Sequence, residues 1–118
     1  MQPGERDAGY LWDMLDSART VRDFVAGVRF EEFLRDRKLQ LAIERSVEII
    51  GEASRRISEE FKQAHPEIPW GRIIAQRNVL AHEYGEIKQE RMWLVATVHV
   101  PALIPQLEAL IPPLPPQA

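Results

Sequence analysis

Apolar residues recur at intervals of three or four positions along most of the chain, and this spacing restricts the fold more than any other feature. The clearest stripe consists of Leu39, Ile43, Val47, Ile50, Ser54, Ile57 and Phe61. A period near 3.6 places such residues on one face of an α-helix, whereas a half-buried strand needs every second position. Only six residues are glycine, and β-branched runs bounded by hairpin turns are absent. The sequence therefore predicts an all-α protein.

Breaks in this periodicity divide the chain into four main helices and one short helical segment. Proline and glycine mark the breaks, because proline interrupts the hydrogen-bond ladder and glycine favours helix ends. The predicted helical segments are residues 10–27, 30–34, 36–64, 69–83 and 88–110. Pro101 and Pro105 lie inside the last segment, so we expect a kink or break near 97–101. The architecture expected is an up-and-down bundle of four main helices, with the last helix kinked near Pro101.

Length and charge limit the class of protein. The 118 residues suit one helical domain over 10–110, with a flexible N-terminus at 1–9 and a proline-rich tail at 111–118. The net charge of -3 restricts any nucleic-acid contact to a small, local surface, since proteins that cover long nucleic acids are usually basic.

Composition also bears on the compartment. The absence of cysteine excludes disulfide scaffolds and cysteine-ligated metal sites, and the N-terminus lacks the apolar core of a signal peptide. We therefore expect a cytoplasmic protein. The longest uncharged stretch, 92–107, is shorter than the roughly 20 apolar residues of a membrane span, so we expect a buried helix and no membrane contact.

One face of the predicted helix 69–83 breaks its apolar pattern at a single position. That face carries Trp70, Ile73, Ile74, Arg77, Leu80, Ala81 and Tyr84. At 100° per residue, Tyr84 lies about 20° from Arg77 and two turns further along. Asn78 and His82 form an i,i+4 pair about 100–140° from Arg77. A guanidinium in such a place needs an acidic partner or an anion, so this segment is the candidate site.

A purely structural explanation remains open at this point. Arg77 can pair with Glu48 or Glu52 of the long helix, and a histidine such as His82 is favoured near a helix C-terminus. His82 is not followed four residues later by the second histidine that a metalloprotease helix needs, so we expect no metal and no cofactor. His99, between two valines, is more typical of a core histidine with satisfied hydrogen bonds than of a ligand.

The segment Arg77-Asn-Val-Leu-Ala-His82-Glu-Tyr84 resembles the R-x4-H-x-Y motif of HepT-like toxins, which belong to the HEPN superfamily of small helical domains. Three further segments resemble the family in the same order. Residues 30–34 resemble its short segment after the first helix, 46–53 its second-helix signature and 65–70 its linker into the motif helix. The likeness spans roughly residues 10–110. It implies the toxin of a HepT/MNT toxin–antitoxin pair and a metal-independent endoribonuclease.

The resemblance also assigns roles to four residues. It implies that Arg77 and His82 are catalytic, with Asn78 in support, and that RNA is cleaved through attack of the ribose 2′-hydroxyl. An imidazole with a reference pKa of about 6.5 suits proton transfer near neutrality, and a guanidinium can hold a phosphate through two hydrogen bonds. Tyr84 is the implied AMPylation site, onto which a cognate minimal nucleotidyltransferase (MNT) transfers AMP to neutralise the toxin.

The expected partners follow from the same resemblance and from helix geometry. Arg77 and His82 lie about 140° apart on one helix and converge poorly on one phosphate, whereas two such helices facing across a two-fold axis form one cleft. A homodimer, an MNT-type antitoxin and an RNA substrate such as tRNA or mRNA are therefore expected. The alternative function is a non-catalytic helical subunit that binds and regulates a minimal nucleotidyltransferase.

Overall fold

The computed structural model describes residues 4–82 and 89–111, and the side chains of 77–82 lie outside this description. Every element among the described residues is helical. The elements are α1 (Glu5–Val25), α2 (Phe30–Leu34), α3 (Arg37–Arg56), α4 (Glu59–Ala64), α5 (Trp70–His82), α6 (Gln89–Leu94), the π-helical turn η1 (Val95–His99) and α7 (Val100–Leu110). The all-α prediction is confirmed.

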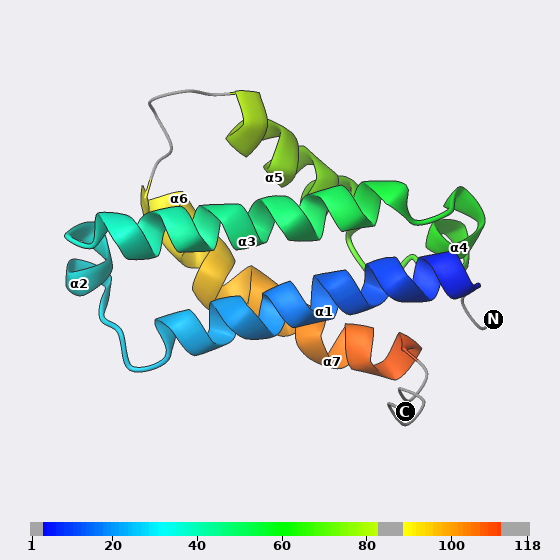
Figure 1. Cartoon of the computed structure of the whole chain (residues 1–118), viewed down its shortest axis with the longest axis horizontal. Coiled ribbons are helices and arrows are strands. Elements are labelled where there is room, and N and C mark those ends of the chain that lie inside the picture. Colours follow the sequence, from blue (N-terminus) through cyan, green and yellow to red (C-terminus); the bar gives the residue numbers. More distant parts are fainter. Residues whose placement is uncertain (1–3, 83–88, 112–118) are drawn as a thin grey trace.

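Four long helical segments form the bundle, with α3 at its centre (Figure 1). α1 and α3 lie side by side and run in opposite directions, joined through the short helix α2. α5 packs against another side of α3, and the helix formed by α6, η1 and α7 packs across α1. The predicted bundle of four main helices plus one short segment is therefore confirmed.

The core is formed by the apolar stripes read from the sequence. Its most deeply buried side chains are Leu11, Met14, Leu15, Ala18, Val21, Phe33, Ile43, Phe61, Ile68, Met92, Ala96 and Leu107. They come from every helical element except α5, and from the turn before α5, so each of these elements turns apolar residues inward. Burial of these faces is the main force that holds the helices together.

The prediction of one helix over 36–64 was wrong, because α3 ends at Arg56 and α4 begins at Glu59. Ser58 is the N-cap of α4, and its hydroxyl oxygen accepts a hydrogen bond from the Phe61 amide at 3.2 Å. Asp7 of α1 accepts hydrogen bonds from the amide and the hydroxyl of Ser58, at 2.9 and 2.6 Å. A tertiary contact therefore fixes the interruption of the helix.

Both ends of the folded region extend beyond the predicted boundaries of 10–110. α1 begins at Glu5 rather than at residue 10 and ends at Val25, before the positive-φ residue Gly27. Ile111, which we assigned to the proline-rich tail, is buried against the core. The remainder of the tail, 112–118, lies outside the described residues.

The last helix is continuous from Gln89 to Leu110 but contains the π turn η1. The amide of Val100 donates to the carbonyl of Val95, five residues back, and Pro101, which has no amide hydrogen, follows at once. The irregularity expected near 97–101 thus takes the form of a π turn. By length and composition this is the one helix in the described part of the chain that could cross a membrane, a property that core helices of soluble proteins share.

Candidate functional site

Helix α5 carries three of the four residues predicted to form the site. Arg77, Asn78 and His82 lie in its last two turns, within a helix that begins at Trp70, close to the predicted residue 69. Tyr84 lies outside the described residues. The helical placement of the motif therefore agrees with the sequence prediction up to His82.

The N-terminal end of α5 is held in place by polar and aromatic contacts. Trp70 is buried, and its indole N–H donates to the carbonyl of His65 at 2.9 Å. The Trp70 ring meets the Phe61 ring edge-on, with centroids 6.5 Å apart. The carbonyl of Pro69 accepts the Ile73 amide at 3.1 Å. These contacts fix the rotation of α5 about its own axis, and hence the register of the motif positions.

The first half of α5 shows which side of the helix is covered. The covered positions are Trp70, Ile73 and Ile74, and the exposed positions are Gly71, Arg72 and Ala75. At 100° per residue, position 77 lies about 20° from Trp70, in line with the covered side. Position 82 lies about 120° from Trp70, in line with the exposed side. Arg77 and His82 are thus about 140° apart and about 7.5 Å apart along the axis, so one helix separates them.

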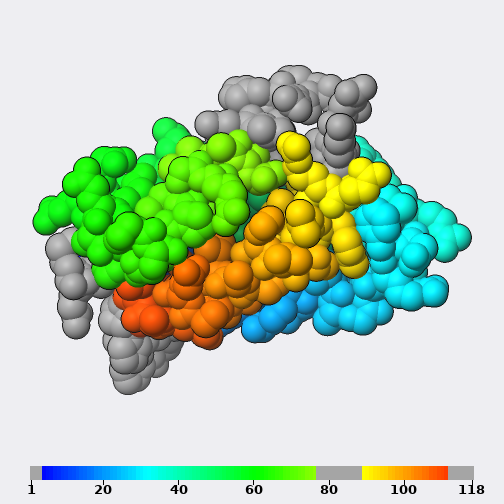
Figure 2. All heavy atoms as spheres, turned by 180° about the vertical axis from the view of Figure 1, so that it is seen from behind, coloured from blue at the N-terminus to red at the C-terminus, as the bar shows by residue number. Residues whose placement is uncertain are grey.

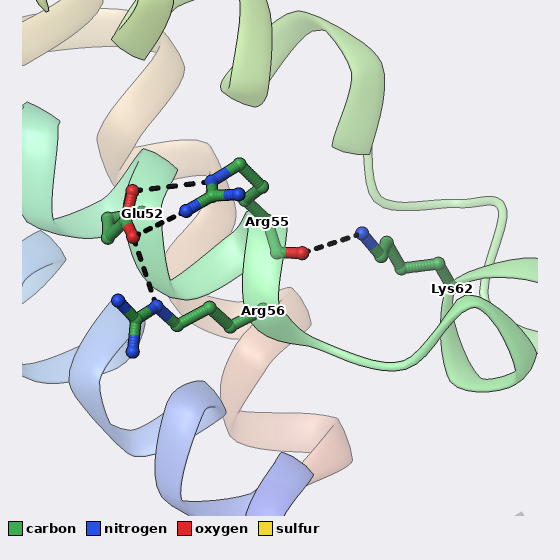
Figure 3. Close-up of polar contacts among 4 residues, drawn as sticks. All are labelled: Glu52, Arg55, Arg56 and Lys62. Atoms are coloured by element: carbon green, nitrogen blue, oxygen red, sulfur yellow. Dashed lines mark hydrogen bonds and ion pairs between the residues drawn. The ribbon is translucent and has the colours of Figure 1, made fainter.

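Glu52, one of the two partners considered for Arg77, makes ion pairs within α3. Its carboxylate accepts hydrogen bonds from Nη2 of Arg55 at 2.9 Å and from Nε of Arg56 at 3.0 Å (Figure 3). Hydrogen bonds with Glu52 and then Tyr10 raise the pKa of the Arg56 guanidinium above its usual value. Two cations of its own helix therefore pair with the Glu52 carboxylate, which lines a groove together with Tyr10 and Asp13 of α1.

Helix α3 carries a buried carboxylate, that of Glu44. Glu44 is 7% exposed, and its Oε1 atom has no hydrogen-bond partner in the part of the chain that the structure describes. Burial raises the pKa of Glu44 above its ordinary value, Arg37 opposes this shift and Glu48 adds to it. Position 44 lies one turn before Glu48, and the helices packed around α3 cover its side chain.

A mostly apolar groove lies between α5, α3 and the last helix. Its walls are Val47, Ile50, Pro69, Ile73, Val95, Val100 and Leu103, and its polar residues are Arg72, Gln76 and His99. Figure 2 shows this face, where α5 (yellow-green) lies alongside the orange segment of η1 and α7. The groove is partly open to solvent.

The three polar side chains of this groove were not predicted as functional residues. His99 was interpreted as a core histidine with satisfied hydrogen bonds, but it is half-buried, and its ring makes no hydrogen bond with any described residue. Arg72 and Gln76 could not be recognised from the sequence pattern, because they lie on the polar side of α5, where exposed side chains are expected. Only the packing of α5 against the last helix brings these residues to one groove.

The fold and the motif together define a class of protein: a small all-α bundle that carries Arg-x4-His-x-Tyr at the end of its third long helix. A family model described as "Ribonuclease HepT-like" matches residues 14–110. The chain therefore belongs to the HepT-like ribonuclease family. Among the described residues, no group of three or more histidine, aspartate or glutamate side chains is placed to hold a metal ion.

Several named relatives support this assignment. The chain is 38% identical over 101 residues to "Probable ribonuclease HepT" of Thermococcus cleftensis, covering 86% of this chain and 92% of the relative. It is 36% identical over 102 residues to the candidate RNase MJ0127 of Methanocaldococcus jannaschii, covering 86% and 84%. It is 33% identical over 102 residues to the candidate RNase TTE0752 of Caldanaerobacter subterraneus, covering 86% and 91%. No solved structure gave a significant match.

Proposed function

We propose that the chain is a metal-independent endoribonuclease and the toxin of a HepT/MNT toxin–antitoxin pair. The observation that carries this proposal is the Arg77-x4-His82-x-Tyr84 motif, which begins on α5 in a chain of the HepT-like ribonuclease family. Relatives that share about a third of its residues over most of their length are named as ribonucleases. The proposed location is the cytoplasm.

The proposed reaction uses the nucleophile that RNA itself contains. His82 accepts the proton of the ribose 2′-hydroxyl, and the 2′-oxygen attacks the adjacent phosphorus. The bond from phosphorus to the 5′-oxygen of the next nucleotide breaks, and that oxygen takes up a proton. The products are a 2′,3′-cyclic phosphate and a 5′-hydroxyl. Arg77 stabilises the negative charge that develops on the phosphate oxygens, and Asn78 orients the imidazole or donates to the phosphate.

A second copy of the chain completes the proposed site. Positions 77 and 82 are about 140° apart on α5, so a single helix does not direct both toward one phosphate. Two α5 helices facing across a two-fold axis place the arginine of one copy opposite the histidine of the other. We therefore propose a homodimer with a shared cleft. Light scattering at micromolar concentration should give twice the 13.6 kDa of one chain, and a mass near 13.6 kDa would rule out the shared cleft.

Tyr84 is the proposed point of control by the antitoxin. A nucleotidyltransferase would join the tyrosine oxygen to the α-phosphate of ATP and release pyrophosphate. The attached phosphodiester is anionic, so it would occupy the anion site of Arg77 and repel RNA. Intact-mass analysis after incubation with the partner and ATP should show added AMP in wild type and none in Tyr84→Phe. An unchanged mass in wild type would contradict this role.

The nuclease activity is tested with purified protein and labelled RNA. Wild type should cleave, whereas Arg77→Ala and His82→Ala should each lose at least 100-fold in rate, as expected when a charge-stabilising group or a proton acceptor is removed. Arg45→Ala on α3 removes the same charge outside the motif and is the matched control. Expression of wild type should slow bacterial growth, and His82→Ala should not. Equal growth of both would favour the alternative, a non-catalytic subunit that regulates a nucleotidyltransferase.

A further inference from the structure

The groove between α5, α3 and the last helix combines an apolar interior with three polar side chains that have no partner among the described residues. Arg72, Gln76 and His99 line it, and none of the three makes a side-chain hydrogen bond or ion pair with the described residues. The remaining walls are aliphatic side chains and Pro69. An apolar hollow with a few convergent polar groups is the usual form of a small-ligand site.

The side chains that line the groove indicate which kind of ligand can bind in it. Aliphatic walls such as Val47 and Ile73 can cover the flat faces of an aromatic heterocycle. The amide of Gln76 both donates and accepts, and the imidazole of His99 can do either, so together they can bind the polar edge of a nucleobase. Arg72 is exposed and cationic and suits a phosphate. The groove opens to solvent, so it can admit one base of a longer strand.

The groove adjoins the proposed cleavage site along α5. Gln76 directly precedes Arg77, and Arg72 lies about 7.5 Å before Arg77 along the helix axis. We propose, resting on the ribonuclease function above, that this groove is a nucleotide subsite of the enzyme. It receives one base of the RNA strand next to the cleaved phosphate, while Arg72 binds a neighbouring phosphate.

A second copy of the chain is the other occupant to consider, and the polar lining argues against it. An apolar side chain from a partner would bury Arg72, Gln76 and His99 without offering them hydrogen bonds, and each such loss opposes binding. A nucleotide supplies acceptors and donors for all three. The charge of Arg72, which pairs with none of the described residues, also matches an anionic chain.

The test measures RNA binding without cleavage, using fluorescence anisotropy of a labelled oligoribonucleotide on the full-length chain carrying His82→Ala. Arg72→Gln in this background should weaken binding about tenfold and reduce the slope of log Kd against log salt by about 0.7, the share of one phosphate contact on a single strand. Arg45→Gln is the matched control, because position 45 lies about 160° around α3 from the groove residue Val47. It should change neither quantity.

The base contact is tested separately with oligoribonucleotides that carry a single abasic position, moved along the strand. One abasic position should weaken binding to the parent protein about fivefold or more, and this difference should disappear in the variant that combines Gln76→Ala with His99→Ala. Equal affinity and salt slope for Arg72→Gln and Arg45→Gln would overturn the proposal. So would groove variants that change the dimer dissociation constant and leave RNA binding intact. If Arg72 and the base contacts contribute to RNA binding as described but the wild-type chain does not cleave RNA, only the nuclease function is contradicted.

Discussion

Replacing the buried carboxylate of Glu44 with an amide should stabilise the protein at neutral pH. Glu44 is 7% exposed, and its Oε1 atom has no hydrogen-bond partner among the described residues. Burial raises its pKa above the ordinary value of 4.5, so the folded chain holds this proton more tightly than the unfolded chain does. The charged form therefore opposes folding above the folded-state pKa, and this opposition is absent below pH 4.5.

The size of the effect follows from the cost of an unsatisfied buried polar group, roughly 1–3 kcal/mol. Gln removes the charge at nearly the same volume but keeps a polar amide, so we expect Glu44→Gln to gain about 1 kcal/mol in the free energy of unfolding at pH 7.5. At pH 4 the carboxyl of the folded wild type is protonated, and the two proteins should then differ little.

Urea unfolding at pH 7.5 and at pH 4 measures this difference directly. Glu48→Gln, the same change at a half-buried position one turn later, is the matched control and should have a smaller effect. Destabilisation by Glu44→Gln at pH 7.5 would show that the carboxylate has a partner, and equal gains at both pH values would show that its charge is not the cause. Either result would refute the reasoning.

Three further variants test how the bundle is held together. Asp7→Ala removes both hydrogen bonds to Ser58 and should lower the free energy of unfolding by about 1–2 kcal/mol in urea, whereas an unchanged midpoint would mean that α4 is capped without α1. Gln40→Ala leaves the carbonyls of Phe33 and Leu34 without their buried donor and should cost about 1–3 kcal/mol, a loss that hydrogen exchange should localise to α2. Phe33→Ala empties a fully buried position and should cost about 3–5 kcal/mol by thermal unfolding, and a loss below 1 kcal/mol would show that α2 is not part of the core.

The presence of each main helix, and the face that it turns to the core, could be predicted from periodicity, because burial of an apolar face depends on spacing within one helix. The ends of the helices were harder to predict, since they depend on contacts with residues far away in the sequence. The interruption after Arg56 shows this: Ser58 followed by Glu59 and Glu60 is a recognisable helix start, but the apolar stripe continues through Ile57 and Phe61 and concealed it. Asp7, 51 positions away in the sequence, completes that cap.

In the candidate site, too, local features could be predicted from the sequence, and features that depend on packing between helices could not. The motif is local, so the sequence alone placed Arg77, Asn78 and His82 on one helix, and α5 agrees. The groove with Arg72, Gln76 and His99 forms only where α5, α3 and the last helix pack together. A pattern within one segment of the sequence does not predict such packing. The burial of Glu44 could not be predicted either, because its side of α3 is covered only after the helices pack.

The chemical ends of the RNA products test the central claim most directly. Purified wild type is incubated with a defined RNA, and the product termini are identified by mass spectrometry, with His82→Ala in parallel. Attack by the 2′-hydroxyl predicts a 2′,3′-cyclic phosphate and a 5′-hydroxyl in wild type and no products above background in the variant. Products that carry a 3′-hydroxyl and a 5′-phosphate, or equal cleavage by His82→Ala, would contradict the account.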